Sequence, residues 1–456
     1  MIIVGAGPAG IFAALEITEK TKLDVLMLDR GHDINQRKCP ASRGLECVHC
    51  DPCSVLSGWG GAGAFSDGKL TLSTEVGGWL NEYVSVKELA DLIDYADRIY
   101  LKFGATEHVY GEDVEKVDQI ERNASLAGLK LVRQKIRHMG TDWCAQTLRK
   151  MRQELNGKVD FKPKTDVKGL MVKDNVVEGV ETEKGEKFLG RYVIAAPGRS
   201  GAEWLQAEAQ SLCLRTLNNP VDIGVRVEVL ATVMEDLTKV LYEPKFIYYS
   251  KSFDDQVRTF CVAPYGEVIT ESYDGVLTVN GQSYAERKTE NTNFAILVST
   301  SFTEPFKEPI AYGKYVARLS NLLSGDVIVQ RLGDLESGRR STPERIARSV
   351  VIPTLKNATP GDLSFVLPYR HLADIREMLQ ALDKIAPGIN SRDTLLYGIE
   401  VKFYSSRLQL SNCLETKIHN LFTAGDGAGV TRGLIQASAS GVMVAKEIVK
   451  REKQKT

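Results

Sequence analysis

Four cysteines near the N-terminus are close enough in sequence to do metal or redox chemistry together. Cys39, Cys47, Cys50 and Cys53 fall within fifteen positions, with two consecutive C-x2-C spacings. Such spacings bring three thiolates round one small centre, and Cys39 would complete the set of four for an iron–sulfur cluster such as [4Fe-4S]. Structural zinc also takes four thiolates, and Cys47 with Cys50 would alternatively form a redox dithiol. The spacing therefore predicts a metal-binding or redox-active loop at residues 37–57, with iron–sulfur, zinc and thiol chemistry all open.

A second group of residues suits phosphate binding. The run Val-Gly-Ala-Gly-Pro-Ala-Gly satisfies G-x-G-x-x-G between an apolar strand at residues 1–4 and a helix at 11–21. Gly5 permits the tight turn, Gly7 lets the backbone approach a pyrophosphate, and Gly10 lets the helix pack closely on the strand. The N-terminus of the helix supplies N–H groups and a positive dipole for phosphate, and Pro8 and Ala9 join the predicted binding residues of this turn.

The next apolar strand, at residues 23–28, ends in an acid. Asp29 follows Gly10 by nineteen positions, and Arg30 comes directly after it. In dinucleotide-binding units an acid at this place holds the ribose hydroxyls, so Asp29 and Arg30 join the predicted binding residues. These residues predict a dinucleotide site, and the motif alone does not separate NAD from FAD.

The far end of the chain separates the two cofactors. Residues 420–429 read Asn-Leu-Phe-Thr-Ala-Gly-Asp-Gly-Ala-Gly, an apolar strand that ends in Gly425 and Asp426. Gly433, Leu434 and Ile435 then start a helix. This pattern resembles the glutathione-reductase-like FAD flavoproteins. The resemblance implies that Asp426 binds the ribitol chain of FAD, and that backbone amides at 433–435 stabilise negative charge at flavin N1 and O2.

Two further elements fit the same resemblance. Tyr192 to Gly198 is similar to the apolar strand that ends in Ala-Thr-Gly in that family, and it places Ala196 and Gly198 beside the cofactor, with Pro197 as a departure from the usual pattern. Val167 lies where the family uses a valine backbone to bracket adenine. The expected cofactor is therefore FAD.

More narrowly, residues 58–69 (Gly-Trp-Gly-Gly-Ala-Gly-Ala-Phe-Ser-Asp-Gly-Lys) and residues 398–404 resemble a group of FAD-dependent dehydrogenases, also described as NAD(P)/FAD-dependent oxidoreductases. In related flavoproteins a second glycine-rich loop passes beside the pyrophosphate and the isoalloxazine ring. The resemblance gives that role to Gly60, Gly61, Ala62 and Gly63. Lys69 is a candidate to reach the flavin or substrate; the alternative is a solvent-facing turn.

A possible catalytic strand lies in the middle of the chain. Residues 258–266 form a strand that runs into a Pro-Tyr-Gly turn, faintly similar to geranylgeranyl reductases. Arg258 and Cys261 are its candidates to face the flavin. The alternative is that Cys261 is a core residue and that Arg258 lies on the surface or in an ion pair.

Composition limits the class of protein. The chain has 456 residues, 43% of them hydrophobic, and a formal net charge of −1. A basic surplus for general nucleic-acid binding is missing, and no run of about 18 apolar residues suggests a membrane span. The chain opens with Met-Ile-Ile-Val rather than a basic segment and an apolar leader, so we expect a soluble, cytoplasmic protein.

These motifs predict an α/β fold: a Rossmann-like FAD-binding domain with an inserted mixed α/β substrate domain. The expected FAD-binding segments are 1–217 and 393–456, and the substrate or lid domain is 218–392. A second G-x-G-x-x-G is missing from residues 80–400, so NAD(P)H would be only a transient donor at the flavin. The predicted function is an FAD-dependent oxidoreductase acting on a small-molecule substrate; the alternative is an electron-transfer flavoprotein acting on a redox partner protein.

Overall fold

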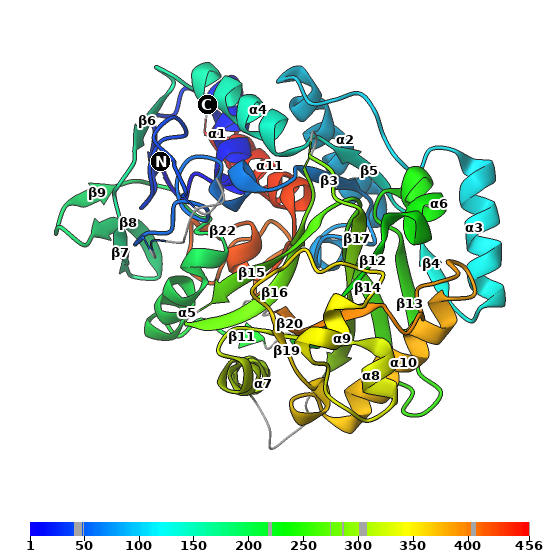
Figure 1. The fold of residues 1–456 in the computed structure, drawn as a ribbon. Coiled ribbons are helices and arrows are strands. Elements are labelled where there is room, and N and C mark those ends of the chain that lie inside the picture. Colours follow the sequence, from blue (N-terminus) through cyan, green and yellow to red (C-terminus); the bar gives the residue numbers. More distant parts are fainter. Residues whose placement is uncertain are drawn as a thin grey trace. The chain divides into compact units, whose positions relative to one another are not determined.

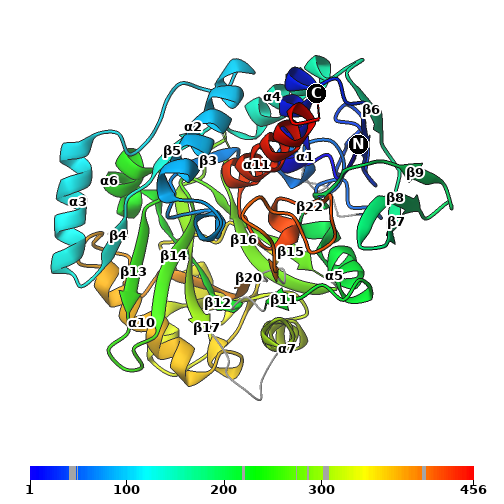
Figure 2. The same ribbon diagram turned by 180° about the vertical axis from the view of Figure 1, so that it is seen from behind.

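The computed structural model describes residues 1–40, 48, 50–217, 221–273, 275–284, 287–300, 308–402 and 407–455 (Figures 1 and 2). The chain divides into two compact units. The first contains Met1–His108, Arg137–Asn219 and Ser405–Thr456, and the second contains Val109–Ile136 and Pro220–Tyr404. The predicted FAD-binding motifs all belong to the first unit, and the chain returns to that unit at its C-terminal end.

The unit boundaries differ from those expected from the sequence at two places. Val109–Ile136 belongs to the second unit because β4 (Lys130–Val132) pairs there with β13 (Lys245–Tyr249). Residues 393–404 also belong to it, because β20 (Leu395–Lys402) pairs with β12 (Val221–Leu230). Both segments join the second unit through strand pairing over long sequence distances.

A five-stranded sheet forms the centre of the first unit. Its strands are all parallel, in the order β22-β10-β1-β2-β6. Four of them are short, largely apolar runs, as is typical of a parallel sheet covered on both faces, whereas the edge strand β6 also carries Asp160 and Lys162. Their bounds are β1 (Ile2–Val4), β2 (Val25–Leu28), β6 (Val159–Lys162), β10 (Val193–Ala195) and β22 (Leu421–Thr423).

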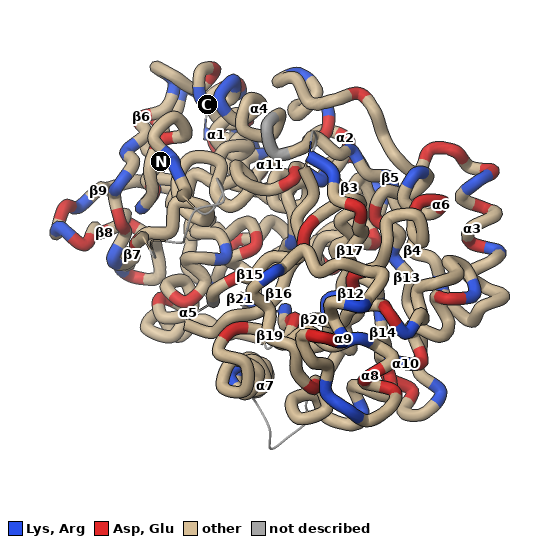
Figure 3. The backbone as a smooth tube through the Cα atoms, in the orientation of Figure 1, with Lys and Arg blue, Asp and Glu red and all other residues tan. Residues whose placement is uncertain are grey.

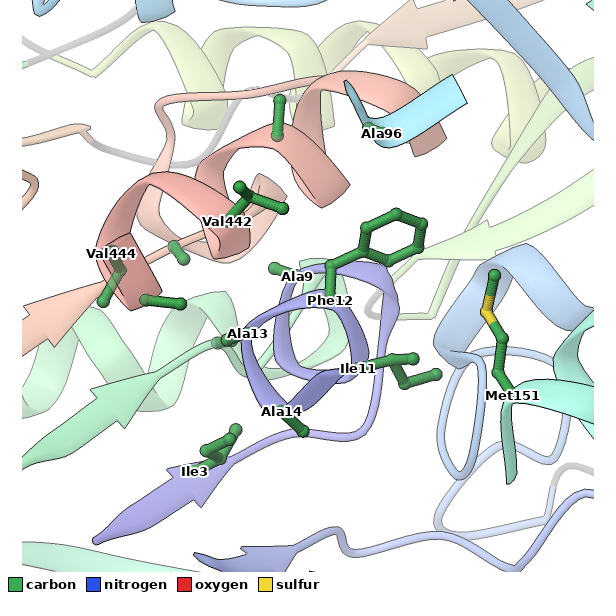
Figure 4. Packing of buried hydrophobic residues seen from close by; sticks show 14 of the residues in the cluster. Ile3, Ala9, Ile11, Phe12, Ala13, Ala14, Ala96, Met151, Val442 and Val444 are labelled. Atoms are coloured by element: carbon green, nitrogen blue, oxygen red, sulfur yellow. The ribbon is translucent and has the colours of Figure 1, made fainter. Parts of the chain in front are cut away.

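Helices α1 (Pro8–Lys20) and α11 (Leu434–Lys453) pack directly against each other. Figure 4 shows Phe12 between the two helices, with Val442 on the α11 side and Ala96 from α2 (Val86–Lys102) close by. All three of these side chains belong to one buried apolar cluster. Small residues on both helices permit the close approach, which brings the first and last helices of the first unit together.

Smaller elements complete the first unit. β7, β8 and β9 form an antiparallel sheet, and β11 pairs with β21. β5 (Lys135–His138) spans the boundary between the units. The remaining bounds are η2 (Gly61–Phe65), β3 (Lys69–Leu72), η3 (Leu80–Glu82), α4 (Thr141–Glu154), β7 (Val167–Lys173), β8 (Val176–Thr182), β9 (Lys187–Leu189), η4 (Arg199–Gly201), α5 (Ala202–Ser211), β11 (Thr216–Leu217), β21 (Arg407–Leu408) and η6 (Asp426–Ala428).

The second unit is built on an eight-stranded sheet, in the order β19-β18-β20-β12-β17-β14-β13-β4. Alternate residues of β12, among them Ile223 and Val225, face an apolar cluster that includes residues of α3, α6, α7 and α10. A hairpin of β15 and β16 pairs separately. The remaining bounds are α3 (Val114–Leu126), α6 (Ala231–Leu241), β14 (Gln256–Ala263), β15 (Glu267–Tyr273), β16 (Val276–Gln282), β17 (Asn291–Thr300), α7 (Pro309–Ser324), β18 (Ile328–Arg331), α8 (Leu332–Glu336), α9 (Pro343–Ala347), β19 (Thr359–Pro360), η5 (Leu363–Phe365) and α10 (Tyr369–Leu382).

The other face of β12 carries three polar side chains that are nevertheless buried, those of Asp222, Arg226 and Glu228. Arg226 is 0% exposed, and its guanidinium donates to Asn293 Oδ1 at 2.8 Å and lies 3.4 Å from Glu400 Oε1. The ammonium of Lys402 lies 2.9 Å from the same carboxylate oxygen. Because a buried charge needs partners to offset its lost hydration, this group is satisfied within the second unit.

Charges of both signs are interspersed along the chain (Figure 3). Among the described residues, no helix is both long enough and apolar enough to cross a bilayer. The architecture confirms the predicted fold class, a mixed α/β protein whose parallel sheet carries the dinucleotide motif.

Candidate functional site

The turn after β1 carries the first group of predicted binding residues. Gly5 has a φ of +104°, and a Cβ there would lie 2.1 Å from the carbonyl oxygen of Ala196. A Cβ on Gly10 would lie 2.1 Å from the carbonyl oxygen of Gly5. Only glycine fits such contacts, so α1 starts directly against the sheet. Gly7 is the N-cap of α1 and has no side chain. Among the described residues, no side chain caps the first N–H groups of this helix.

Asp29 holds this turn from the end of β2. Its Oδ2 accepts the N–H of Ala6 at 2.8 Å, and its Oδ1 accepts the N–H of Gly31 at 2.8 Å. A carboxylate oxygen has two acceptor positions, so each oxygen keeps capacity for a ligand hydroxyl. The neighbouring Arg30 instead forms an ion pair with Asp51 at 2.9 Å. Of the two predicted residues, Asp29 is the one that contacts the glycine turn.

Val167 is buried at the start of β7. The segment before it is fixed beside Asp29, because the N–H of Thr165 donates to the Asp29 carbonyl at 2.9 Å. The N–H of Lys164 donates to the Gly31 carbonyl at 2.8 Å. The structure therefore brings the segment predicted to bracket adenine next to the predicted ribose acid.

The second glycine loop lies against the first turn. The N–H of Gly60 donates to the Ala6 carbonyl at 2.7 Å, and a Cβ on Gly61 would lie 3.2 Å from the Cα of Gly7. A Cβ on Gly63 would lie 2.6 Å from the side chain of Leu434. Gly60 and Gly61 thus lie against the turn before α1, Gly63 lies close to the start of α11, and Ala62 lies between Gly61 and Gly63 in η2. The lack of side chains at these glycines permits this approach.

Parallel pairing aligns the carboxyl ends of three strands. Val4 pairs with Ala195, and Ala195 pairs with Thr423. The predicted residues Ala196 and Gly425 follow these strand ends. A Cβ on Gly425 would lie 3.1 Å from the Cβ of Ala9, at the start of α1. The N-terminal and C-terminal motifs therefore meet at one edge of the sheet, where ligands bind in folds of this type.

Gly198 and Asp426 extend this edge. A Cβ on Gly427 would lie 2.4 Å from the carbonyl oxygen of Gly198, so the two turns touch. Asp426 Oδ1 accepts the hydroxyl of Thr431 at 2.9 Å, and Oδ2 accepts the N–H of Gly433 at 3.4 Å. Burial raises the pKa of Asp426, and the positive charge of Arg199 and the two hydrogen bonds oppose that shift. A half-buried carboxylate is thus held directly beside the start of α11.

α11 starts as α1 does. Its N-cap, Gly433, has a φ of +81° and makes no side-chain capping hydrogen bond among the described residues. Leu434 and Ile435 are its first two residues. The N-terminus of a 20-residue helix carries partial positive charge, so this end of α11 favours a negative group beside it.

The sequence did not indicate Arg37. Its buried guanidinium donates to the carbonyls of Ser54, Val55, Trp59 and Gly61 at 2.6 to 3.0 Å. Burial lowers the pKa of this guanidinium to about 10. Arg37 therefore ties the cysteine-containing segment to the second glycine loop. A lone arginine in a loop gives no sequence signal for such a role.

Lys69 lies in a group of titratable side chains beside the same loop. Its ammonium lies 3.2 Å from Asp67 Oδ2, and the two side chains are only 11% and 19% exposed, so the solvent-facing alternative is wrong. Backbone bonds from Met139 and Gly140 to residues 67–68 bring His138 alongside. Burial lowers the pKa of His138 to about 4. His138 was missed because only long-range pairing places it here.

Cys144 lies against the same loop from α4. Its thiol donates to the carbonyl of Gly63 at 3.0 Å, and burial raises the pKa of the thiol to about 12. A thiol held in its neutral form is a poor nucleophile. Cys144 therefore packs against the second glycine loop and is not expected to react.

The cysteine-rich segment is only partly described. Cys47 lies outside the described residues, and the structure describes the other three predicted cysteines, Cys39, Cys50 and Cys53. Among the described residues, no group of three or more His, Cys, Asp or Glu side chains could hold a metal ion. Cys39 is buried, whereas Cys50 and Cys53 are half-buried. The pKa of Cys50 is lowered, chiefly by the backbone N–H of Ser54, which donates to its sulfur at 3.4 Å.

Arg258 and Cys261 lie on β14 in the second unit. The guanidinium of Arg258 forms an ion pair with Asp222. Cys261 has a φ of +47° at an irregularity of the sheet, and its carbonyl accepts the guanidinium of Arg226 at 2.6 Å. The predicted ion pair of Arg258 is present. The roles proposed for both residues toward the flavin stay predictions.

Comparison with known proteins adds a family match. Residues 220–403, most of the second unit, match the family described as "FAD-dependent protein, C-terminal domain-like". An uncharacterized protein from Clostridium beijerinckii is 28% identical over 482 residues, an alignment that covers 99% of this chain and 80% of that relative.

Solved structures give more distant likenesses. An Escherichia coli quinol fumarate reductase subunit is 12% identical with a TM-score of 0.43, covering 100% of this chain and 70% of that chain. An L-proline dehydrogenase from P. horikoshii is 13% identical with a TM-score of 0.40, covering 99% and 93%. These values are too low to transfer an activity. The family match agrees with the chain's own glycine motifs, and the resemblance to FAD-dependent proteins is confirmed by it.

Proposed function

We propose that this chain is an FAD-dependent oxidoreductase. The observation that carries the proposal is that three glycine segments lie together at one edge of the parallel sheet: Gly61 lies against Gly7, and Gly63 lies against Leu434, the first residue of α11. Two long helices start there with glycine N-caps and without side-chain caps among the described residues. Two helix N-termini beside glycine-rich turns suit a molecule with a pyrophosphate and a charge-accepting ring.

Each part of the site has a role that its chemistry supports. The amides at the start of α1, near Gly7, would bind the pyrophosphate, and Asp29 would accept the ribose hydroxyls. Asp426 would accept hydroxyls of the ribitol chain. Amides at 433–435 would favour negative charge on the ring. When bound, FAD supplies the transfer of two electrons as a hydride between its N5 atom and a substrate.

The chain's own groups beside the second glycine loop would manage protons. Asp67 and Lys69 are an ion pair in a poorly exposed position, and His138 is held neutral by burial. Neutral His138 can donate a hydrogen bond from one ring nitrogen and accept one at the other, and the ammonium of Lys69 can donate a proton or stabilise a negative centre. We assign these three residues to the reacting end of the site. Asp67 and Lys69 follow the second glycine loop within a few residues, and the backbone bonds of Met139 and Gly140 to residues 67–68 place His138 with them, which supports this assignment.

The finer predictions are kept as proposals. The substrate would be a small molecule, and NAD(P)H would act only as a transient donor. An electron-transfer flavoprotein that serves a redox partner protein is the alternative. Turnover separates the two: an oxidoreductase should reoxidise its reduced flavin with a small acceptor at a saturable rate, whereas a carrier should react mainly with a protein.

The iron–sulfur and zinc predictions for Cys39, Cys47, Cys50 and Cys53 rest on spacing alone. Analysis of iron, acid-labile sulfide and zinc in anaerobically purified protein tests them independently of the flavin. About four iron and four sulfide per chain would support a [4Fe-4S] centre. One zinc per chain would support the structural alternative.

The function itself is tested by the cofactor that the protein retains. The purified chain should carry FAD with a visible flavin spectrum, and anaerobic reduction should bleach that spectrum reversibly. Release of a different nucleotide on denaturation, or a protein that never binds FAD, would refute the proposal.

A further inference from the structure

Helix α7 of the second unit presents large apolar side chains to solvent. Tyr315, Leu319, Leu322 and Leu323 are 68%, 39%, 80% and 52% exposed. Counted from Tyr315, the three leucines follow at four, seven and eight positions. Residues at these spacings lie on one side of a helix, so the four side chains form a single exposed stripe, called the α7 stripe below.

The opposite side of α7 is fixed to the second unit. Val316 is buried in the apolar cluster of that unit. The Ser320 hydroxyl donates to the Gly398 carbonyl at 2.9 Å. The side chain of Asn321 accepts the N–H of Leu277 at 2.9 Å and donates to the carbonyl of Leu277 at 3.0 Å. The helix cannot rotate without breaking these contacts, so the α7 stripe is held toward solvent.

The size of the α7 stripe is unusual for an exposed surface and small for a protein interface. Large apolar side chains cover about 150 to 250 Å² each, so the exposed fractions leave an apolar area on the order of 400 Å². Contiguous apolar patches of this size on a folded chain often serve binding. A stable protein–protein interface buries about 800 Å² on each partner. The α7 stripe alone therefore does not suffice for a stable dimer.

The charge of α7 distinguishes the remaining partners. From Pro309 to Ser324 the helix carries Lys314 and Arg318 and no acidic residue. Arg318 is exposed and lies three positions after Tyr315, on the side of the stripe. Two copies of α7 packed through the stripe would bring positive charges together with no acid of either helix to offset them. Anionic lipid headgroups instead attract basic side chains, and leucines beside those side chains enter the acyl boundary.

We propose that the α7 stripe binds the surface of an anionic membrane, with α7 lying along that surface. The leucines of the stripe enter the boundary between headgroups and acyl chains. The Tyr315 ring lies at the level of the headgroups, where an aromatic ring with a polar end is favoured. The Arg318 guanidinium donates to lipid phosphates. Binding is reversible and does not depend on the proposed flavin.

Sedimentation of the full chain with lipid vesicles tests the proposal. One set of vesicles contains equal parts of phosphatidylcholine and phosphatidylglycerol, and the other contains phosphatidylcholine alone. The wild type should bind the anionic vesicles, at least about fivefold more strongly than the neutral ones, and added salt should weaken binding. Leu322→Gln combined with Leu323→Gln should lower the partition coefficient at least about tenfold. Arg318→Gln should lower it about fivefold.

A matched control is available in the same unit. Leu126 is 82% exposed at the end of α3, so Leu126→Gln makes the same chemical change at equal exposure and should leave vesicle binding unchanged. α3 differs from α7 in carrying three acids, Glu115, Asp118 and Glu121. Circular dichroism checks that each variant is folded, and FAD content is measured in every sample, so loss of flavin and loss of vesicle binding are seen separately.

Three results would overturn the proposal. The first is a wild-type chain that stays in solution with the anionic vesicles. The second is a double leucine variant that binds the anionic vesicles as strongly as the wild type does. The third is a wild-type dimer, measured by light scattering, that the double leucine variant abolishes, because a second copy of the chain would then cover the α7 stripe.

Discussion

Gly441 gives a direct test of how α1 and α11 position the candidate site. It lies inside α11, and a Cβ at this position would lie 2.0 Å from the carbonyl oxygen of Ala9 and 2.8 Å from its carbonyl carbon. Both atoms belong to the backbone of the first turn of α1, so a rotamer change cannot relieve the contact. Gly441→Ala therefore forces the two helices apart.

The magnitude follows from two opposed effects. Replacing a helical glycine by alanine ordinarily stabilises a helix by about 1 kcal/mol. An ordinary contact begins near 3.4 Å, so the helices must move apart by about 1.4 Å. Overpacking in a close-packed interior costs about 3 kcal/mol at the upper end of its usual range, and a backbone clash of this depth belongs there. We expect Gly441→Ala to lose about 2 kcal/mol in the free energy of unfolding.

Urea denaturation followed by circular dichroism measures this loss, and titration with FAD measures the effect on the site. Because the displaced turn carries the proposed pyrophosphate amides, FAD affinity should fall together with stability. Gly157→Ala is the control: its Cβ meets nothing within 4 Å, so only the cost of a positive φ, about 1 kcal/mol, is expected, with FAD affinity unchanged. If Gly441→Ala were as stable as the wild type or more so, the close packing of α1 on α11 would be refuted.

Three other changes have defined outcomes. Asp426→Ala should weaken FAD binding about 10- to 100-fold, measured by equilibrium titration, because a charge-assisted hydrogen bond is lost. A variant that keeps its flavin through extensive dialysis would contradict the assignment of Asp426 to the ribitol chain. Burial raises the pKa of Asp374 to about 6, above the pKa of the same carboxyl in the unfolded chain. The charged form of Asp374 therefore destabilises the fold at neutral pH, and this penalty disappears as the pH falls to about 4. Asp374→Asn should then raise the free energy of unfolding by about 1 to 2 kcal/mol at pH 7 and by almost nothing near pH 4; an equal effect at both values would refute this. The guanidinium of the buried Arg137 donates to the Asp97 carboxylate at 2.7 and 2.8 Å. Asp97→Ala removes that carboxylate and should lower the free energy of unfolding, measured by urea denaturation, by about 3 kcal/mol. A loss below about 1 kcal/mol would contradict this prediction.

The sequence predicted the parts of the site that depend on local backbone demands. Gly5 and Gly10 are required by contacts within a few residues of β1 or with the adjacent strand, and glycine spacing records such demands directly. The strands at both ends of the chain were predicted for the same reason, since each is a short apolar run bounded by glycine. Their parallel pairing through β10 then brings the two motifs together.

Long-range pairing accounts for what was missed. His138 reaches the second glycine loop only because Met139 and Gly140 bond to residues 67–68. Arg37 acts through four carbonyls that lie 17 to 24 positions away. Neither residue belongs to a motif with fixed spacing, so no local pattern indicates its role.

The starts of two further helices carry little local signal in the sequence. α5 and α6 begin at Ala202 and Ala231, after Gly201 and Leu230, and neither N-cap makes a side-chain capping hydrogen bond among the described residues. Without a capping Ser, Thr, Asp or Asn, the sequence carries little signal for the start of a helix. Packing against the rest of each unit decides these elements.

Titration of the apoprotein with FAD is the measurement that decides whether the glycine segments at both ends of the chain bind one cofactor. We expect saturation at one FAD per chain, with a perturbed flavin spectrum. FMN, which lacks the adenosine half of FAD, and NAD, which lacks the flavin half, should bind much more weakly. Equal affinity for FMN would show that the N-terminal glycine turn and Asp29 take no part, and failure to bind FAD at all would contradict the proposed function.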